Sequence, residues 1–519
     1  MNKKRDLVIL GGGLAGMGLA LQVKKQQPDF NIAVIEKNAF PRPPAIAKVG
    51  ESTVEIASHY LGDQLGLRDH LDSKHLRKFG LRIFLGSQAK DFSQLDELGP
   101  SVHFGIPTYQ LDRGVLENHL SEQLRAQQIE LIDRAAITDI DLSDTKSIDF
   151  TTPAGAQRLQ SRWLVDAAGR AAIVKKKLSL QMPNEHKANA VWFRVDRRII
   201  VDNWTTDSAW HARPYIANER WKSTNHLSGP GYWVWIIPLE SGVTSIGIVM
   251  DDIAFNAADI NSPQSAMRWL AHNQPLCADA IGDAKFLDFV VLPNYSYDCK
   301  KLLSDERWAL SGEAGFFADP FYSPGSDFIA IANGFITSLI ADDRAGKNIQ
   351  VNAAVYEKLF RSIYQSTLNL YIGQYGGFGD RLMMGLKILW DIAYYWGVLS
   401  LLYFRNALSD YQKVRPLIND LFSVQDINKK IQDAFRRRAA QRLVLPARGV
   451  FADQNQLPCF NHLMDTLRKP VDADVQTDLT ENIAILRIVA DVVVDTLEGR
   501  PLSPEGRQWV GDYCDRLAG

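Results

Sequence analysis

The chain is poor in cysteine and nearly neutral. Its 519 residues include four cysteines, which form no Cys-x-x-Cys pair and have no histidine cluster beside them: Cys277, Cys299, Cys459 and Cys514. Isolated cysteines predict neither a disulfide framework nor a zinc site, and they are typical of a reducing compartment. A formal charge of −2 at pH 7 gives no general attraction to nucleic acid or to an anionic membrane. We therefore expect a cytoplasmic protein without a metal site or a nucleic-acid partner.

Long apolar runs are also scarce. The first residues, MNKKRDLVILGGG, are basic and then apolar, but the apolar run at 7–10 is too short for a secretory signal. The segment from Leu382 to Phe404 approaches the length of a membrane span, yet it contains Lys387 and Asp391 at the spacing of a helical ion pair. We expect a buried amphipathic helix there and no transmembrane segment. Two alternative roles for this segment stay open: an aromatic wall for an apolar substrate, and a peripheral membrane contact.

The first forty residues contain the pattern of a dinucleotide-binding unit. A short apolar strand at 7–10 is followed by a glycine turn and then by a helical pattern through Lys25; the turn consists of Gly11, Gly12, Gly13, Leu14, Ala15 and Gly16. The glycines let a pyrophosphate approach the backbone at the helix N-terminus, and Gly16 lets the helix pack closely on the strand. A second strand ends in Glu36, 20 residues beyond Gly16, where a carboxylate accepts ribose hydrogen bonds. The pattern predicts a Rossmann-type α/β fold.

Three later segments decide between FAD and NAD. They are QLDRGVLENHL, WLVDAAGR and WALSGEAGFFADPFYSPGSDFIAIANGF. In this order they resemble the FAD-binding framework of the flavoprotein monooxygenase and halogenase superfamily. The resemblance implies FAD, with Arg113 beside the flavin, the segment from Asp166 to Arg170 near the adenosine half, and Glu313, after Gly312, on the ribityl chain. The family usually has Asp at this last position. Glu is one methylene longer than Asp, and its carboxylate can still accept a hydrogen bond from the ribityl chain.

Two tryptophans lie two residues apart in the segment GYWVWIIPLE. Trp-x-Trp-x-Ile-Pro, with Trp233, Trp235 and Pro238, resembles the signature of the flavin-dependent halogenases, and the chain follows that family's order to about residue 345. Alternation puts both indoles on one face of a strand that Pro238 ends. The resemblance implies that this face separates the flavin from the substrate, so that the ring is not hydroxylated directly. The alternative is an ordinary pair of core tryptophans.

The family's chemistry also requires a lysine beside the substrate. The segment VGEST resembles the family's Gly-Glu-Ser loop, here Gly50, Glu51 and Ser52, and Lys78 precedes the next expected strand, as in the phenol- and pyrrole-acting members. The resemblance implies that reduced FAD, O2 and chloride or bromide give hypohalous acid, which moves to this lysine. A desolvated lysine donates hydrogen bonds to hypohalous acid or forms a haloamine. Lys74 is the nearest competitor, and a surface lysine is the alternative interpretation.

The flavin loop departs from the family pattern at the halide site. The family has Ser-Thr-Gly or Ser-Ser-Gly after Asp-Pro, and its backbone N–H groups bind halide, whereas this chain has Ser323, Pro324 and Gly325 after Pro320. Proline has no N–H, which leaves the Gly325 N–H and the Ser323 hydroxyl. One lost bond to an ion costs about 1.5 to 3 kcal/mol, or roughly tenfold or more in affinity. Tyr322 stands where tryptophan halogenases have Glu, which argues against free tryptophan as substrate.

The remainder of the chain suggests the partners. Residues 187–295 are rich in strands and aromatic side chains, and helical periodicity dominates from 346 to 519. We therefore expect an FAD-binding domain at 1–345 with an inserted β region, followed by a helical region. One dinucleotide fingerprint occurs, so reduced flavin is expected from a separate NAD(P)H-dependent reductase. The basic segment KKIQDAFRRRAAQR predicts a solvated helical face, with docking of an acyl carrier protein as the alternative.

These observations favour a two-component FAD-dependent halogenase in secondary metabolism. The expected substrate is an electron-rich aromatic compound, in the first place a phenol, either free or tethered to a carrier. A flavin monooxygenase that has lost halide capture is the runner-up, because of Pro324. A noncatalytic FAD-containing partner is a third hypothesis. His226, just before the tryptophan strand, is interpreted as a hydrogen-bonded structural residue rather than a base.

Overall fold

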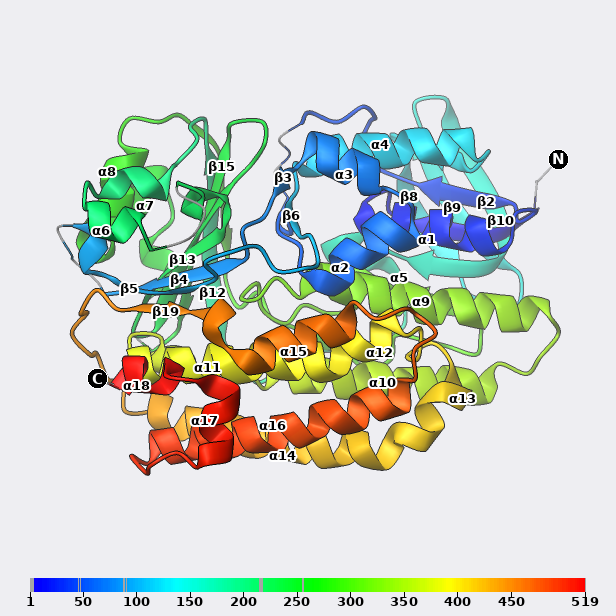
Figure 1. The fold of residues 1–519 in the computed structure, drawn as a ribbon. Helices are drawn as coiled ribbons and strands as arrows, with labels where there is room; N and C mark the ends of the chain where they lie inside the picture. Colours follow the sequence, from blue (N-terminus) through cyan, green and yellow to red (C-terminus); the bar gives the residue numbers. More distant parts are fainter. Residues whose placement is uncertain are drawn as a thin grey trace.

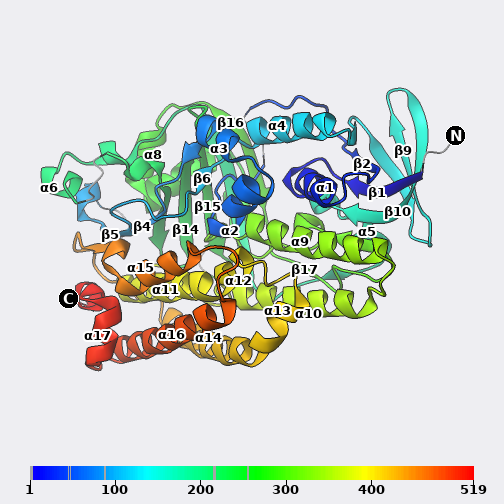
Figure 2. The ribbon, with the colours of Figure 1, turned by 45° about the vertical axis from the view of Figure 1, so that its right-hand side comes forward.

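The computed structural model describes residues 4–44, 46, 48–86, 89, 91–213, 218–253 and 256–518. The amino-terminal part of the chain forms a sheet with helices against it, and a second sheet, mostly green in Figure 1, lies beside it. The helices coloured yellow to red lie below both sheets in Figures 1 and 2. None of the described helices is long and apolar enough to cross a membrane.

The first sheet has a parallel core. Its order is β7 (Glu130–Ile132), β2 (Ile32–Ile35), β1 (Lys4–Leu10), β10 (Gly155–Asp166), β9 (Lys146–Thr152) and β8 (Ala136–Asp141), and β18 (Trp308–Leu310) pairs with the end of β10. Strands β7, β2, β1, β10 and β18 run parallel. The expected strand at 7–10 is the fully buried end of β1, as a parallel strand covered on both faces requires. The predicted Rossmann-type fold is confirmed.

Three helices pack around this core. The glycine turn follows β1 at once and leads into α1 (Leu14–Gln26), while α4 (Arg113–Ala126) and α9 (Gly325–Arg344) pack against α1 from either side. The carboxyl ends of β1 and β10 meet at one edge of the sheet, because Leu10 is paired in register with Asp166. A ligand site is expected at this edge in a doubly wound sheet.

The second sheet extends beyond the predicted insert. Its order is β16 (Phe286–Leu292), β12 (Ala188–Val195), β15 (Thr244–Asp251), β14 (Tyr232–Pro238), β13 (Thr224–Gly229), β4 (Leu81–Leu85), β5 (Asp96–Gly99) and β19 (Phe451–Asp453). Five of these strands fall within 187–295, whereas β4 and β5 come from the amino-terminal part and β19 from the carboxyl-terminal part. The domain boundary expected at 345 falls directly after a helix, α9, and stays a prediction; the last third of the chain still contributes a strand to the sheet.

The carboxyl-terminal region is a helical layer. Its helices are α10 (Gln350–Leu368), α11 (Arg381–Tyr394), α12 (Leu401–Phe404), α13 (Tyr411–Val414), α14 (Ile418–Ala439), α15 (Pro458–Leu467), α16 (Val475–Leu497), α17 (Pro504–Val510) and α18 (Tyr513–Ala518). The apolar segment expected to be a buried helix is α11, a π-helical turn at Tyr395–Ser400, and α12. Lys387 and Asp391 form a buried ion pair of 2.8 Å, as their spacing predicts.

Short elements complete the chain. They are α2 (Glu55–His59), a π-helical turn at Tyr60–Gln64, α3 (Arg68–Lys74), α5 (Ile173–Lys177), α6 (Ser208–His211), α7 (Pro263–Asn273), α8 (Pro275–Ile281), and the paired strands β3 (Leu76–Arg77) with β6 (Tyr109–Gln110) and β11 (Gln181–Met182) with β17 (Asp298–Cys299). The β3–β6 pair holds the segment that carries Lys78 against the loop before α4.

The basic segment at the end of α14 does not form a uniformly solvated face. Arg438 pairs with Asp380 at 2.6 Å, and Arg442 pairs with Asp251 at 2.9 Å. These pairs join α14 and the residues just after it to the N-cap of α11 and to β15 of the second sheet. Only part of the run, including Lys429 and Lys430, remains exposed. The positive surface available to an acidic carrier protein is therefore smaller than the sequence suggests.

Candidate active site

A cavity of about 990 Å³ lies at the carboxyl edge of the first sheet. The predicted cofactor and halide residues that line it are Gly11, Gly13, Leu14, Ala15, Glu36, Gly50, Glu51, Ser52, Arg113, Gly312, Glu313, Pro320, Ser323 and Gly325. These residues come from segments more than 300 positions apart in the chain. The folded chain brings nearly the whole predicted set into one cavity.

Two predicted cofactor residues, Gly16 and Asp166, do not line this cavity. A Cβ atom at Gly16 would lie 2.0 Å from the carbonyl oxygen of Gly11, so this glycine allows α1 to start close to the turn. The Asp166 carboxylate accepts hydrogen bonds from the N–H groups of Ala168 at 3.0 Å and Val174 at 2.8 Å. Asp166 is buried, and it fixes the turn whose residues do line the cavity. Asp166 therefore acts on the cavity through this turn, and the expectation that the segment from Asp166 to Arg170 lies near the adenosine half stays a prediction.

Glu36 occupies the position expected of a ribose-binding carboxylate. One of its oxygens accepts the Gly12 N–H at 2.7 Å, and the other accepts the Asn38 N–H at 2.8 Å. The carboxylate therefore ties the glycine turn to the end of β2 and still faces the cavity. Gly11 has a φ of +104°, and a Cβ atom there would lie 2.4 Å from the carbonyl oxygen of Ala167. This position requires glycine.

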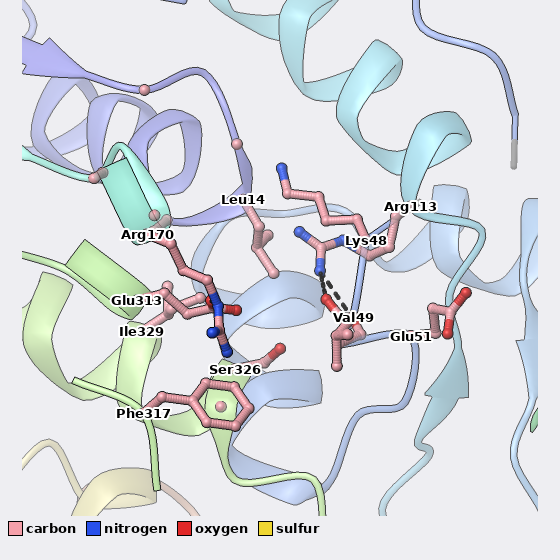
Figure 3. A pocket seen from close by; sticks show the side chains of 18 of the residues that line it. Leu14, Lys48, Val49, Glu51, Arg113, Arg170, Glu313, Phe317, Ser326 and Ile329 are labelled. Atoms are coloured by element: carbon pink, nitrogen blue, oxygen red, sulfur yellow. Dashed lines mark hydrogen bonds and ion pairs between the residues drawn. The ribbon is translucent and has the colours of Figure 1, made fainter. Parts of the chain in front are cut away.

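Arg113 and Lys48 supply positive charge on one side of the cavity (Figure 3). The Arg113 guanidinium donates to the carbonyl oxygens of Val49 at 3.0 Å and Gly50 at 3.1 Å, and it also contacts Glu117 at 2.9 Å. Lys48 pairs with the same Glu117 at 2.7 Å, and a Cβ at Gly13 would lie 2.8 Å from its Nζ. Lys48 was not predicted. It places a cation over the glycine turn, where a pyrophosphate would lie.

Arg170 and Glu313 lie together on another side of the cavity in Figure 3. Arg170 Nε donates to Glu313 Oε2 at 3.0 Å, and both side chains remain partly exposed. The role expected for Glu313 at the ribityl chain remains a prediction. Glu51 is buried beside Ser52. Burial raises the pKa of Glu51 to about 8, although a hydrogen bond from Ser245 acts to lower it.

The residues present fit FAD. The glycine turn, Glu36 and Lys48 would hold the adenosine and pyrophosphate, and the cavity continues past the flavin loop to the tryptophan strand. His226 Nδ1 is buried and has no hydrogen-bond partner in the described part of the chain, although the ring lines the cavity. This differs from the hydrogen-bonded histidine that we expected. Burial, with the nearby Lys78, lowers the pKa of His226 to about 3, so the ring is neutral at pH 7.

A second cavity, of about 620 Å³, lies on the other side of the flavin loop and contains Lys78. Lys78 is 4% exposed, and its amine donates to Ser52 Oγ and to the carbonyl oxygen of Thr53, both at 3.0 Å. Ser52 lines the first cavity, so the amine lies where the two cavities meet. Burial lowers the pKa of Lys78 to about 8, against the raising effect of nearby carboxylates. The competitor Lys74 is exposed and lines neither cavity.

The wall between the cavities comes mainly from the flavin loop. Pro324 and Phe328 line both cavities. Trp233 and Trp235 lie on one face of β14, as predicted, with ring centroids 5.7 Å apart, and both are buried and line the first cavity alone. Trp233 also packs edge-on against Phe321 of the loop at 5.1 Å. Both indoles therefore face the flavin side, and their catalytic role remains a prediction.

The flavin loop is held in an unusual backbone conformation. Tyr322 and Ser323 have φ values of +69° and +58°, and α9 begins directly after Pro324. The Ser323 N–H donates to the carbonyl oxygen of Pro320 at 2.9 Å. The first N–H groups of α9, at Gly325 and Ser326, have no acceptor inside the helix, and the positive end of the helix dipole lies beside the first cavity. Ser326 lines the first cavity and was not predicted (Figure 3).

Two buried carboxylates flank Lys78 in the second cavity. Asp327 accepts the Ala57 N–H at 2.8 Å and the Tyr395 hydroxyl at 2.6 Å. Burial raises the pKa of Asp327 to about 7 and also raises the pKa of Glu55. Tyr322, at the position where tryptophan halogenases have Glu, donates its hydroxyl to Asp391 at 3.0 Å. The sequence offered no local signal for either Asp327 or Glu55.

Comparisons with known proteins agree with this arrangement. The sequence profile of the family described as "Tryptophan halogenase" matches residues 6–88 and 74–376. The flavin-dependent halogenase chlA of Dictyostelium discoideum is 27% identical over 427 residues, which cover 76% of this chain and 70% of the relative. The 1H-pyrrole-2-carbonyl peptidyl-carrier-protein chlorinase of Pseudomonas fluorescens is 24% identical over 344 residues, with 62% of this chain and 72% of the relative covered.

A solved structure shares the fold. The halogenase PltM in complex with phloroglucinol and FAD is 18% identical and superimposes with a TM-score of 0.66, covering 93% of this chain and 96% of that chain. The similarity therefore extends through the helical layer that forms much of the second cavity.

Proposed function

Because this chain belongs to the tryptophan halogenase family of flavin-dependent halogenases, we propose that it halogenates an electron-rich aromatic compound, in the first place a phenol, through Lys78. It is an FAD-dependent oxidoreductase that uses reduced FAD, O2 and a halide ion. Bound FAD supplies the oxidising chemistry that converts halide to hypohalous acid. The comparisons do not favour the alternative of a monooxygenase that does not halogenate.

The position of Lys78 carries this proposal. The Lys78 amine contacts Ser52 of the first cavity, while the Lys78 side chain lines the second cavity. A small oxidant that leaves the first cavity would therefore meet this amine where the two cavities join. With a pKa of about 8, roughly a tenth of the amine is neutral at pH 7. The neutral amine can take the halogen of hypohalous acid, forming an N–halogen bond and releasing water, while the ammonium form can hold the acid by hydrogen bonds. In either case the ring gains the halogen and loses a proton.

The proposal also includes a redox partner and a form of the substrate. The sequence contains one dinucleotide fingerprint, and we expect a separate NAD(P)H-dependent flavin reductase in the cytoplasm to deliver reduced flavin. The Pseudomonas fluorescens relative acts on a carrier-bound pyrrole, so a carrier-bound substrate stays an option. The internal pairing of Arg438 and Arg442 leaves less positive surface for a carrier and favours a free substrate.

Halide dependence is the direct test of the proposed function. With chemically reduced FAD, O2 and either bromide or chloride, we expect the enzyme to halogenate the trap monochlorodimedone. The reaction without halide, which releases only hydrogen peroxide, is the control. If the enzyme releases peroxide but does not halogenate the trap with either bromide or chloride, the halogenase proposal is wrong and the monooxygenase alternative is favoured.

Pro324→Thr is expected to strengthen halide binding roughly tenfold. The change restores a backbone N–H next to Gly325, and one hydrogen bond to an ion contributes about 1.5 to 3 kcal/mol. Pro324 is the N-cap of α9, where Thr is also a favourable residue. The measurement is the KM for bromide in the trap assay. Pro324→Ala is the matched variant, because it restores the N–H without a hydroxyl, and an unchanged KM in both variants would exclude this position from halide binding.

A further inference from the structure

The second cavity is larger than one aromatic ring requires. A buried cavity of roughly 150 Å³ accommodates benzene, whereas this one measures about 620 Å³. A phenol held near Lys78 would therefore leave most of the space empty. The lining of that remaining space indicates what else the substrate carries.

The lining is apolar away from Lys78. Helices α10 and α14 contribute Leu359, Ile363, Ile418, Leu421 and Phe422. The exposed Phe422 places an aromatic side chain at the cavity's edge, with 62% of it accessible. Such a surface favours a hydrocarbon group over water.

Most polar groups on this helical side have partners within the protein; the exception is Lys358 of α10, which is exposed and has no hydrogen bond or ion pair among the described residues. Gln425 donates to Ser362 at 3.1 Å and to Ser366 at 3.2 Å, which joins α14 to α10. Asp391 pairs with Lys387 at 2.8 Å. A ligand that extends along this side would meet few free hydrogen-bonding groups, so a polar pantetheine arm is poorly matched to it.

One buried donor without a partner lies on the opposite wall. Gln454 is 1% exposed and lines the cavity, and its Nε2 has no hydrogen-bond partner in the described part of the chain. It directly follows β19, which pairs with β5, and β5 pairs with β4 close to Lys78. No other buried side-chain nitrogen or oxygen among the described residues of this cavity lacks a partner.

From this distribution we propose that the second cavity binds an amphiphilic phenol. A ring hydroxyl accepts from Gln454 on the Lys78 side, and an alkyl or other hydrocarbon substituent extends between α10 and α14 toward Phe422. The substrate class rests on the proposed function, because Lys78 must reach the ring. The binding prediction itself needs no turnover.

The test measures binding without halide or reductant. Resorcinol, 4-propylresorcinol and 4-hexylresorcinol are titrated into the FAD-loaded enzyme by calorimetry. Each fully buried methylene should tighten binding about fourfold. We expect at least a tenfold gain from resorcinol to the propyl compound and a further gain with hexyl. Equal affinities for all three, or release of FAD by the hexyl compound, would overturn the proposal.

Variants separate the two ends of the ligand. Leu359→Asp should abolish the gain from the alkyl chain, whereas Val351→Asp, on the same helix but 66% exposed and outside the cavity, should retain it. Gln454→Leu should weaken all three ligands by a similar factor and keep the dependence on chain length. A chain-length dependence that survives in Leu359→Asp, with FAD binding and thermal stability like those of Val351→Asp, contradicts the proposed path of the tail.

Two further outcomes keep this proposal distinct from the proposed function. Tight binding of hexylresorcinol with no halogenation under either halide would leave the cavity assignment standing and remove the halogenase proposal. Stronger binding of a pantetheine-linked phenol than of the hexyl compound would overturn the hydrocarbon assignment in favour of a carrier-bound substrate.

Discussion

Lys78→Met is expected to lower halogenation of the aromatic substrate roughly 1,000-fold or more, while FAD binding and peroxide release continue. The amine is the only group of this side chain that can receive or hold the halogen at the boundary of the cavities, and methionine fills similar space without it. Removing a buried charge with a lowered pKa is not expected to destabilise the fold. The measurement is product formation with reduced FAD, O2 and bromide, beside flavin fluorescence for binding.

Lys74→Met is the matched control, because Lys74 is exposed and lines neither cavity. It should keep the activity of the parent enzyme. Loss of FAD binding in Lys78→Met would assign Lys78 to the cofactor site instead, since its amine also contacts Ser52. Full substrate halogenation in Lys78→Met would mean that free hypohalous acid reacts without a relay.

The pH dependence distinguishes the two roles open to Lys78. If the neutral amine takes the halogen, the rate should rise about tenfold per pH unit up to the pKa of about 8 and then level off. If the ammonium form holds hypohalous acid, Lys78 adds no rise of its own below that pKa, and the rate should fall above it. Halogenation of the aromatic substrate by added hypobromous acid, without flavin, isolates this step from the chemistry of the cofactor.

The sequence was most informative where function depends on local spacing. The glycine turn after β1, the carboxylate of Glu36 and the Lys387–Asp391 pair each depend on residues that lie close together in the chain, and each is found in the structure. The resemblance to the halogenases added residues that no local rule connects, including Lys78 and Arg113. Arg113 lines the first cavity and Lys78 the second, and their roles remain predictions.

Features that depend on distant pairing were missed. Asp327 and Glu55 meet beside Lys78 although they are far apart in the chain, and neither type of residue is unusual on a helix. Strand β19 joins the second sheet from within a helical region, and this brings Gln454 to the cavity wall. Asp166 was assigned to the cofactor from its place in a motif, but its two backbone hydrogen bonds give it a structural task.

Asp327→Asn is expected to lower substrate halogenation between about 100-fold and 10,000-fold, the range for loss of a general base. The ring must lose a proton after it gains the halogen, and Asp327 is a buried carboxylate in the same cavity as Lys78. Its pKa of about 7 means that the ionised base becomes available as the pH rises through 7. The parent enzyme should therefore show a rise in rate near that pH, and the Asn variant should lack it.

Tyr395→Phe tests this assignment without removing the carboxylate. The Tyr395 hydroxyl donates to Asp327 at 2.6 Å and lowers the pKa of that carboxyl, so its loss should move the rise in rate to higher pH. Glu55→Gln is the comparison for the other carboxylate beside Lys78. An inflection that stays in Asp327→Asn and disappears in Glu55→Gln would transfer the role of the base to Glu55. An inflection that Tyr395→Phe leaves in place, with the rate at high pH unchanged, would show that Asp327 does not control the loss of the proton.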